Sequence, residues 1–199
     1  MKLILVRHGE TEENVARILI GHGHGKLTAL GIEQAKKAGL RLKNEKIDIA
    51  YVSDLERTCT TAKEILKFHP HLPVVYTKEL RERDFGIYEG KKLDEVKKEL
   101  GVHDWVMGHS QRLGGGESRA ETQERMIMFC DSILKKHSHQ TVLLVSHGGP
   151  ITLFYLHLFG KSYEEYDSHH PSNAAITILE ISDDKKHTVH VLNCVRHLE

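Results

Sequence analysis

Two histidines stand directly after short apolar segments that lie far apart in the chain. His8 follows the segment Lys2–Arg7, and His147 follows Thr141–Ser146. Short apolar runs of this kind are typical of buried strands, so each strand is expected to deliver an imidazole at its carboxyl end. Imidazole titrates near neutral pH and can act as a nucleophile or as a proton carrier. Because Arg7 adds a fixed cation beside His8, the pattern indicates chemistry on an anion.

A second arginine and two helix starts are predicted to reach the same place. Arg57 falls in the first turn of a helix that follows a predicted strand over Ile47–Val52. Gly148 and Gly149 begin the helix after His147, and their lack of side chains lets the backbone approach a ligand closely. Helix amino ends carry partial positive charge and free N–H groups. Two guanidinium groups, two imidazoles and two helix amino ends together indicate a site for a tetrahedral dianion such as phosphate.

Binding a phosphate group does not by itself require two imidazoles. A neutral imidazole nitrogen attacks phosphorus when an acceptor holds the other ring nitrogen and thereby fixes the tautomer. The arginines would neutralise charge on the oxygens of the transferring group. A departing alkoxide also needs a proton, and a carboxylic acid is the candidate donor. Spacing alone leaves Glu79, Glu82 and Asp84 open for this role.

The elements that position these residues alternate between strand and helix. Helices are predicted from Thr28 to about Leu42, from Ser53-Asp54 onward, over about Lys92–Leu100, over Ser118–Lys136 and over Ile151–Phe159. Further strands are predicted over Pro73–Tyr76, Ala174–Ile181 and Thr188–Leu192. This alternation favours an α/β fold with a mainly parallel sheet covered on both faces, in which ligands bind at the carboxyl ends of the strands.

Helical spacing of apolar residues predicts which helix faces are buried. The predicted buried sets are Ile32, Ala35, Ala38 and Leu42 in one helix and Leu55, Cys59, Ala62 and Leu66 in the next. The helix around Ile151–Phe159 is apolar nearly all round and is expected to be buried, with Pro150 in its first turn. Residues 81–117 are rich in glycine and charge and are predicted to form an insertion that covers the active site.

Composition narrows the class of protein. The 199 residues fit a single domain, predicted over 1–199, and the 28 basic and 28 acidic side chains balance. We therefore expect no nucleic-acid partner and no membrane partner. The cysteines, Cys59, Cys130 and Cys194, are widely spaced and are expected to be reduced thiols. Since the first apolar run is broken by Arg7, no signal peptide is expected, and the predicted location is cytoplasmic.

Histidine is unusually frequent, with 16 residues, several of them in close pairs. The pairs are His22 and His24, His69 and His71, His137 and His139, and His169 and His170. A structural zinc site usually includes cysteine among its ligands, and no cysteine lies near these pairs. We expect these histidines to be solvated residues of loops and helix ends, and we expect no metal site.

Taken together, the motifs resemble one known family. "RHGET" at 7–11, "SDLERTCTTA" at 53–62, "LRERDFGIYEG" at 80–90 and "SHGG" at 146–149 resemble the histidine phosphatase superfamily, in its phosphoglycerate-mutase-like branch. The resemblance implies a three-layer α/β/α sandwich with a mainly parallel sheet and a chemistry that needs no metal. It implies that His8 is the nucleophile that becomes phosphohistidine, that Glu82 is the proton donor, and that His147 stabilises the transferring group.

The same resemblance extends the set of candidate binding residues. Arg7 and Arg57 complete the phosphate pocket with His147, and Asn14 adds a polar contact to the phosphate. The remaining candidates for substrate binding are Gly21, His22 and Gly148.

The resemblance leaves the reaction open between a phosphatase and a mutase. The acid motif "LRERDFGIYEG" resembles the phosphatase members more, and the chain is short for a mutase, which must exclude water from its intermediate. We therefore expect a metal-independent phosphatase acting on a small phosphorylated metabolite without a cofactor, as a monomer or homodimer. The alternatives are a cofactor-dependent phosphoglycerate mutase, which would need a bisphosphoglycerate primer, and a non-catalytic phosphate-binding module. A metal-dependent hydrolase is motivated only by the abundance of histidine.

One loop departs from the usual pattern of the family. Where members often have "GxxDxPLT", this chain has "GHGHGKLT", so that His24 and Lys26 replace an aspartate and a proline. The loop is expected to shape the mouth of the pocket, and Lys26 to favour substrates that carry further negative charge.

Overall fold

Six strands form one mixed sheet in the computed structural model, which describes residues 1–102, 109–182, 184 and 186–199. The strands are β1 (Lys2–Arg7), β2 (Ile49–Ser53), β3 (Val74–Thr77), β4 (Thr141–Ser146), β5 (Ile176–Ile181) and β6 (His187–Cys194). Their order is β3-β2-β4-β1-β5-β6. The first four in this order pair in parallel, and β5 pairs antiparallel with both β1 and β6. The predicted mainly parallel sheet is confirmed.

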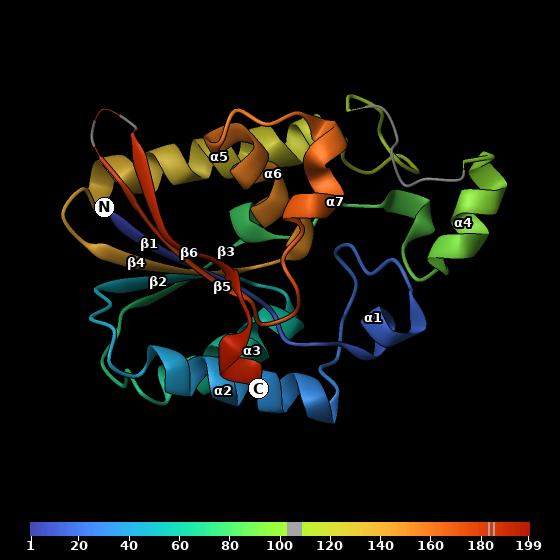
Figure 1. Ribbon diagram of the computed structural model, residues 1–199. Coiled ribbons are helices and arrows are strands. Elements are labelled where there is room, and N and C mark those ends of the chain that lie inside the picture. The colour runs from blue at the N-terminus through green and yellow to red at the C-terminus, as the bar shows by residue number, and fades with distance from the viewer. Residues whose placement is uncertain (103–108, 183, 185) are drawn as a thin grey trace.

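Helices cover both faces of the sheet and give the expected three layers (Figure 1). On one face lie α2 (Ala29–Leu42) and α3 (Glu56–Leu66), and on the other lie α5 (Arg119–Lys136) and α6 (Gly148–Leu158). Three shorter helices, α1 (Glu12–Ala16), α4 (Leu93–Leu100) and α7 (Tyr166–His169), lie on connecting segments. No helix within the described residues is long and apolar enough to cross a membrane.

The core divides into two layers, because side chains alternate along each strand. In β1, Leu3 and Leu5 pack with the residues of α5 and α6, whereas Ile4 and Val6 pack with those of α2 and α3. All four side chains are at most 1% exposed. A strand buried on both faces must be apolar throughout, which explains why the predicted strands before His8 and His147 are continuous apolar runs.

Helix α6 is buried as predicted, since every residue from Gly148 to Leu156 is withdrawn from solvent. The predicted buried face of α3 is confirmed for Leu55 and Ala62 and was wrong for Cys59 and Leu66. The helix begins at Glu56, and Cys59 and Leu66 are only half-buried, while Arg57, Thr61 and Ile65 face the sheet. Polar side chains can face inward here because hydrogen bonds satisfy them: the Thr58 hydroxyl donates to the carbonyl of Ser53, and Arg57 donates to the carbonyls of Gly21 and Gly23. Ile32 in α2 is likewise half-buried.

The segment 81–117 carries α4 and most of a small apolar cluster. Its buried residues Tyr88, Val96 and Leu113 pack with Leu19 of the loop after α1, and a bridge between Ile18 and Lys92 joins the same two segments. In Figure 1, α4 lies beyond the edge of the sheet, beside α1. Part of the predicted insertion, 103–108, lies outside the described residues, and its role as a cover over the active site stays a prediction, as does the single domain over 1–199.

Candidate active site

The two strands that end in histidine are neighbours in the sheet. Arg7 of β1 is in register with Ser146 of β4, so His8 and His147 follow the two strands at the same edge. The ring centroids of His8 and His147 lie 5.2 Å apart, and the side chains are only 2% and 0% exposed. The predicted meeting of two imidazoles is therefore confirmed.

One hydrogen bond fixes the tautomer of His8. Nδ1 lies 2.7 Å from the carbonyl oxygen of Gly9, which can only accept, so Nδ1 carries the hydrogen and Nε2 keeps its lone pair. Burial, and then the nearby charges of Arg57 and Arg7, hold the pKa of His8 well below its usual range. His8 is thus a neutral imidazole with a free Nε2, which is the form that attacks an electrophile.

His147 has both ring nitrogens engaged. Its Nδ1 accepts from Nε of Arg57 at 3.1 Å, so the hydrogen resides on Nε2, which donates to Oγ of Ser53 at 2.8 Å. Burial, and then Arg57, hold the pKa of His147 well below its usual range. Neutral His147 therefore links the ends of β2 and β4 to the guanidinium of α3.

Both arginines are held through carbonyl oxygens. Arg57 is 1% exposed and donates to the carbonyls of Gly21 at 2.7 Å and Gly23 at 3.0 Å. Nη1 of Arg7 donates to the carbonyl of Pro171 at 2.7 Å, while its buried Nε has no hydrogen-bond partner. Among the described residues, neither guanidinium has a carboxylate at salt-bridge distance. Two guanidinium groups without a carboxylate at salt-bridge distance, one on the buried Arg57 and one on the half-buried Arg7 with its unpaired Nε, fit an anionic ligand.

The electrostatics of the arginines agree with this geometry. Burial lowers the pKa of Arg57 to about 10, and Glu82 acts in the opposite direction. Burial also lowers the pKa of Arg7, with Glu82 again opposing it. Both groups still carry their charge at neutral pH.

Glu82 lies against the amino end of α6. Its Oε2 accepts from the N–H of Gly149 at 3.2 Å, and its Oε1 accepts from the N–H of Arg83 at 2.9 Å. A Cβ added to Gly149 would lie 2.1 Å from Oε1 of Glu82, so only glycine leaves room for the carboxylate here. The structure thus brings Glu82, rather than Glu79 or Asp84, into contact with the helix that follows His147.

The other candidate binding residues take different positions around this centre. Asn14 accepts through Oδ1 from Asn173 at 3.0 Å, and Asn173 also donates to the carbonyl of His8 at 3.2 Å. Nε2 of His22 lies 3.0 Å from the carbonyl of Glu82, to which it donates. Gly21 has φ +53 and offers its carbonyl to Arg57. Asn14 is therefore connected to His8 through Asn173, and His22 to Glu82 directly.

Sequence reasoning missed His170 at this site. A Cβ added to Gly148 would lie 2.5 Å from Nε2 of His170 and 3.3 Å from Cζ of Arg7, so the imidazole lies over Gly148 beside Arg7. The Thr152 hydroxyl donates to the carbonyl of Gly148 and accepts from Nδ1 of His170 at 3.0 Å. Desolvation by the neighbouring groups, and then the charge of Arg7, lower the pKa of His170, although the residue is exposed to solvent. Only the pair of adjacent histidines in the sequence pointed toward this residue.

The expectation that the paired histidines are solvated was wrong for His137, which is 6% exposed and lies 2.8 Å from the hydroxyl of Tyr51. His170 reaches the site but remains exposed to solvent. Tertiary packing brings the His137 ring inward, and no local pattern encodes it. In the part of the chain that the structure describes, no three His, Cys, Asp or Glu side chains are grouped so as to hold a metal ion.

In the loop that differs from the family pattern, the two replaced positions, His24 and Lys26, are exposed at the surface. Lys26 is exposed, and its Nζ lies 3.7 Å from Oε1 of Glu12. This exposed pair partly offsets the positive charge that Lys26 was expected to add.

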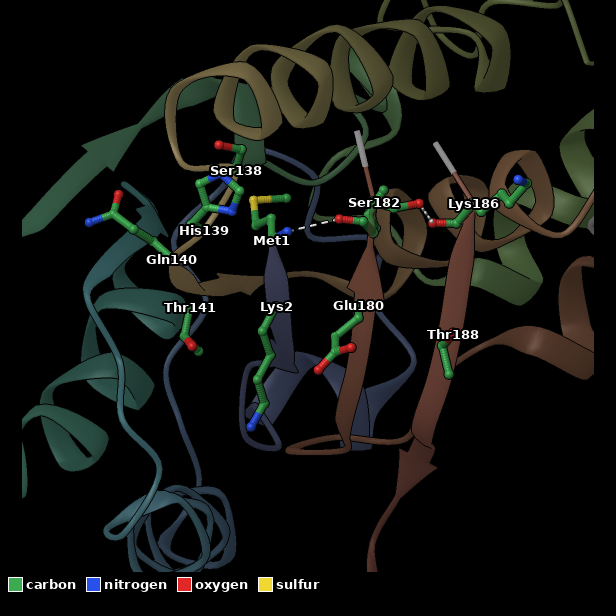
Figure 2. Close-up of a pocket in the computed structure, with 11 residues that line it drawn as sticks. Met1, Lys2, Ser138, His139, Gln140, Thr141, Glu180, Ser182, Lys186 and Thr188 are labelled. Atoms are coloured by element: carbon green, nitrogen blue, oxygen red, sulfur yellow. Dashed lines mark hydrogen bonds between the residues drawn. The ribbon is translucent and has the colours of Figure 1, made fainter. Parts of the chain in front are cut away.

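A cavity of about 400 Å³ lies at the other end of the strands, where β1 and β4 begin (Figure 2). None of the candidate site residues lines it. Met1, Gln140, Glu180 and Lys186 are among its lining residues, and the amino group of Met1 donates to the carbonyl of Ile181 there. The convergent polar groups therefore lie at the carboxyl edge of the sheet, away from this hollow.

Comparison with known proteins points in the same direction as the geometry. The family model of the histidine phosphatase superfamily (branch 1) matches residues 3–194. Phosphoserine phosphatase 1 of Hydrogenobacter thermophilus is 32% identical over 201 residues, covering 100% of this chain and 94% of that protein. The 2,3-bisphosphoglycerate-dependent phosphoglycerate mutase of Bartonella bacilliformis is 35% identical over 172 residues, covering 82% of this chain and 84% of that protein.

A solved structure matches the whole fold. Bacillus stearothermophilus YhfR superposes with a TM-score of 0.92 and 29% identity, covering 100% of this chain and 99% of that one. The family model spans nearly the entire chain, and the matched residues 3–194 include His8 and His147. The chain therefore belongs to the histidine phosphatase superfamily, in its phosphoglycerate-mutase-like branch.

Proposed function

We propose that the protein is a phosphatase that hydrolyses a small-molecule phosphomonoester through a phosphohistidine on His8. The observation that carries this proposal is the state of His8, a neutral buried imidazole whose Nδ1 is tied to the Gly9 carbonyl and whose Nε2 is free. The unpaired cations Arg7 and Arg57 flank it, as a phosphoryl-transfer site requires.

In the first step, the lone pair on Nε2 of His8 attacks phosphorus while the bond from phosphorus to the leaving oxygen breaks. The carboxylic acid form of Glu82 gives its proton to that oxygen, and the alcohol departs. In the second step, a water molecule attacks phosphorus and passes a proton to the Glu82 carboxylate. The phosphorus–nitrogen bond breaks, which returns neutral His8, protonated Glu82 and free phosphate.

The two arginines stabilise negative charge on the transferring group, and His147 positions one of them, Arg57. Arg7 and Arg57 neutralise the oxygens of the transferring group, and Asn14 contributes a polar contact at the same centre. His147 fixes the plane of Arg57 through its Nδ1, so we propose that it stabilises the transferring group through that guanidinium. Gly21, His22 and Gly148 shape the surrounding wall, where substrate is expected to lie.

The proposed substrate is a small phosphorylated metabolite, and the proposed reaction uses no cofactor. Support for hydrolysis rather than transfer comes from the phosphatase relative, which aligns along this whole chain, whereas the mutase relative aligns over part of it. Three free cysteines, Cys59, Cys130 and Cys194, support a reducing location, and we propose the cytoplasm.

The test is hydrolysis of p-nitrophenyl phosphate by wild type and by His8→Ala, each with and without EDTA. We expect wild-type turnover that persists in EDTA and falls by at least about 1,000-fold in the variant, since the covalent route is lost. Trapping of acid-labile ³²P on wild type but not on His8→Ala would identify the intermediate. Turnover that disappears in EDTA, or that survives in His8→Ala, would contradict the mechanism.

A mutase is the second candidate, because one of the relatives that this chain resembles is named a phosphoglycerate mutase. It predicts interconversion of 3- and 2-phosphoglycerate that depends on added 2,3-bisphosphoglycerate. Primer-dependent isomerisation that is faster than hydrolysis of the same substrate would establish it in place of the phosphatase.

A further inference from the structure

The segment that carries Glu82 has no regular structure to hold it. Residues 81–85 form neither helix nor strand, and within the described chain neither the N–H nor the carbonyl of Glu82 pairs with another backbone group. Upstream, the fully buried Leu80 anchors the chain, and its carbonyl accepts from Oγ of Ser146 at 2.7 Å. Because a misplacement of about 1 Å can cost about 100-fold in rate, something further must fix the position of Glu82.

Arg125 of α5 grips the backbone on the upstream side. Its Nη1 donates to the carbonyls of Glu79 at 2.7 Å and Arg81 at 3.0 Å, and its Nη2 donates to the carbonyl of Glu82 at 3.4 Å. One guanidinium therefore touches three carbonyls within four residues. A planar, rigid fork of donors is suited to this task, whereas an ammonium group is not.

Glu117 completes the grip and extends it downstream. Its carboxylate accepts from Nε of Arg125 at 3.0 Å and from Nη2 at 2.8 Å, in a bidentate pair. The same Oε2 accepts from the N–H of Asp84 at 3.2 Å. The two side chains are only 16% and 24% exposed, so solvent competes weakly for these bonds. The pair thus holds the backbone on both sides of Glu82.

We propose that Arg125 and Glu117 are positioning residues that hold Glu82 for proton transfer. Among the described residues, this pair, called here the Arg125–Glu117 clamp, forms no hydrogen bond to Arg7, His8, Arg57 or His147. It acts through the placement of one carboxyl group. This role rests on the proposed function, in which Glu82 protonates the leaving oxygen. If the ion pair only stabilised the fold, its removal would not selectively slow proton transfer from Glu82 to the leaving oxygen.

Leaving-group dependence separates the two roles. A phenolate such as p-nitrophenolate departs without a proton, whereas an alkoxide needs one. Loss of a well-placed acid therefore slows alkyl phosphates, such as O-phosphoserine or glycerol phosphate, more than p-nitrophenyl phosphate. The readout is the ratio of kcat/KM for one alkyl phosphate to that for the aryl phosphate, which falls when general-acid catalysis is lost.

The variants are Arg125→Ala, Arg125→Lys and Glu117→Gln, with Glu82→Gln as the reference for a lost acid. Lys135→Ala serves as the matched control, because it removes an exposed cation from the same helix. Circular dichroism and Tm confirm folding, and Arg125→Lys and Glu117→Gln retain bulk if the alanine variant does not fold. We expect Arg125→Ala to lower the alkyl-to-aryl ratio by about 10- to 100-fold, Arg125→Lys to recover little of it, and Lys135→Ala to leave it unchanged.

The double variant Glu82→Gln/Arg125→Ala decides the assignment. If the clamp acts through Glu82, the ratio in the double variant equals that in Glu82→Gln alone. An equal loss on both substrates in folded Arg125 and Glu117 variants, or a further loss of ratio in the double variant, would overturn the proposal. A different result would show that the proposed phosphatase mechanism itself is wrong. In that case Glu82→Gln would leave the alkyl-to-aryl ratio unchanged, or His8→Ala would remain active.

Discussion

At the scale of single residues, the site works by controlling protonation states through burial and specific bonds. His8 is neutral because burial and two arginines disfavour its charged form, and the Gly9 carbonyl selects which nitrogen is free. The same arginines lack carboxylate partners among the described residues, so their charge remains available to an anion. In the proposed function, the phosphate-binding site and the neutral nucleophile are thus two results of one arrangement.

The first residue-scale prediction concerns the charge of His8. Since its folded-state pKa lies well below that of an unfolded chain, the ring stays neutral as pH falls through about 6.5. We expect ¹⁵N NMR at about pH 5.5 to show a neutral ring protonated on Nδ1, with His8→Asn identifying the resonances. The unfolded chain takes up this proton and the folded chain does not, so this contribution lowers the free energy of unfolding below about pH 6.5. A His8 ring that becomes charged at its ordinary pKa would contradict the inferred environment.

A second prediction concerns Gly149. A methyl group there would occupy the space of Oε1 of Glu82, at 2.1 Å, and must displace the carboxylate. We expect Gly149→Ala to reduce kcat/KM for an alkyl phosphate about 10- to 100-fold more than for p-nitrophenyl phosphate. The aryl substrate is the internal control for an intact phosphate pocket. Equal kcat/KM values for wild type and Gly149→Ala on the alkyl phosphate would contradict this prediction, because they would show that displacing the Glu82 carboxylate does not slow catalysis.

At the scale of elements, neighbouring strands and the helices after them carry the site. Strands β1, β4 and β2 lie side by side, and His8, His147 and Arg57 each follow one of them. The far end of the same scaffold holds a polar network, in which His137, just after α5, joins Tyr51 of β2 at 2.8 Å and Gln140 at 2.5 Å. This network lies toward the edge of the sheet opposite to the site, where α5 turns into β4.

The element-scale prediction separates stability from activity. Tyr51→Phe keeps the ring that packs on Phe129 but removes the hydroxyl, which leaves Nε2 of buried His137 without a partner. We expect the free energy of unfolding to fall by about 1–3 kcal/mol in urea titrations, with kcat/KM unchanged. Tyr76→Phe, at a residue that is 55% exposed, is the matched control and should change neither quantity. A loss of activity in folded Tyr51→Phe would mean that the two edges of the sheet are coupled.

At the scale of the whole molecule, the apolar packing is uneven. The two clusters against the sheet hold most of the buried apolar residues, whereas the cluster around Leu113 and Val96 has only a few members. A small apolar cluster stabilises its segment less than a large one does. The segment with α4 is therefore expected to open locally while the sheet stays folded.

Hydrogen exchange tests this expectation. We expect amides of α4 to exchange through openings that cost less free energy than the openings that expose β1 and β4. Leu144→Ala in β4, a residue that is 0% exposed, should lower global stability by about 2–5 kcal/mol. Leu113→Ala, at a residue that is 1% exposed, should mainly speed exchange in α4 and leave the protection of β4 in place. Equal effects of both variants on β4 would show that the molecule unfolds as one unit.

The sequence alone was sufficient for the fold class and for the centre of the site. Strands buried on both faces must be apolar throughout, so the positions of β1 and β4, and of His8 and His147 after them, follow from local composition. Arg57 was placed correctly because a residue in the first turn of a helix after a parallel strand must lie at the carboxyl edge. These are local rules, and they hold without knowledge of the packing.

Tertiary structure decided what local rules do not encode. The choice of Glu82 over Glu79 and Asp84 depends on the contact with Gly149 and on Arg125, which lies 43 residues away along the chain. His170 reaches the centre only because the chain returns over α6, and Arg57 can be buried only because the loop after α1 brings the carbonyls of Gly21 and Gly23 to it. Such contacts join side chains across long separations in sequence, and only the packed chain brings them within hydrogen-bonding distance.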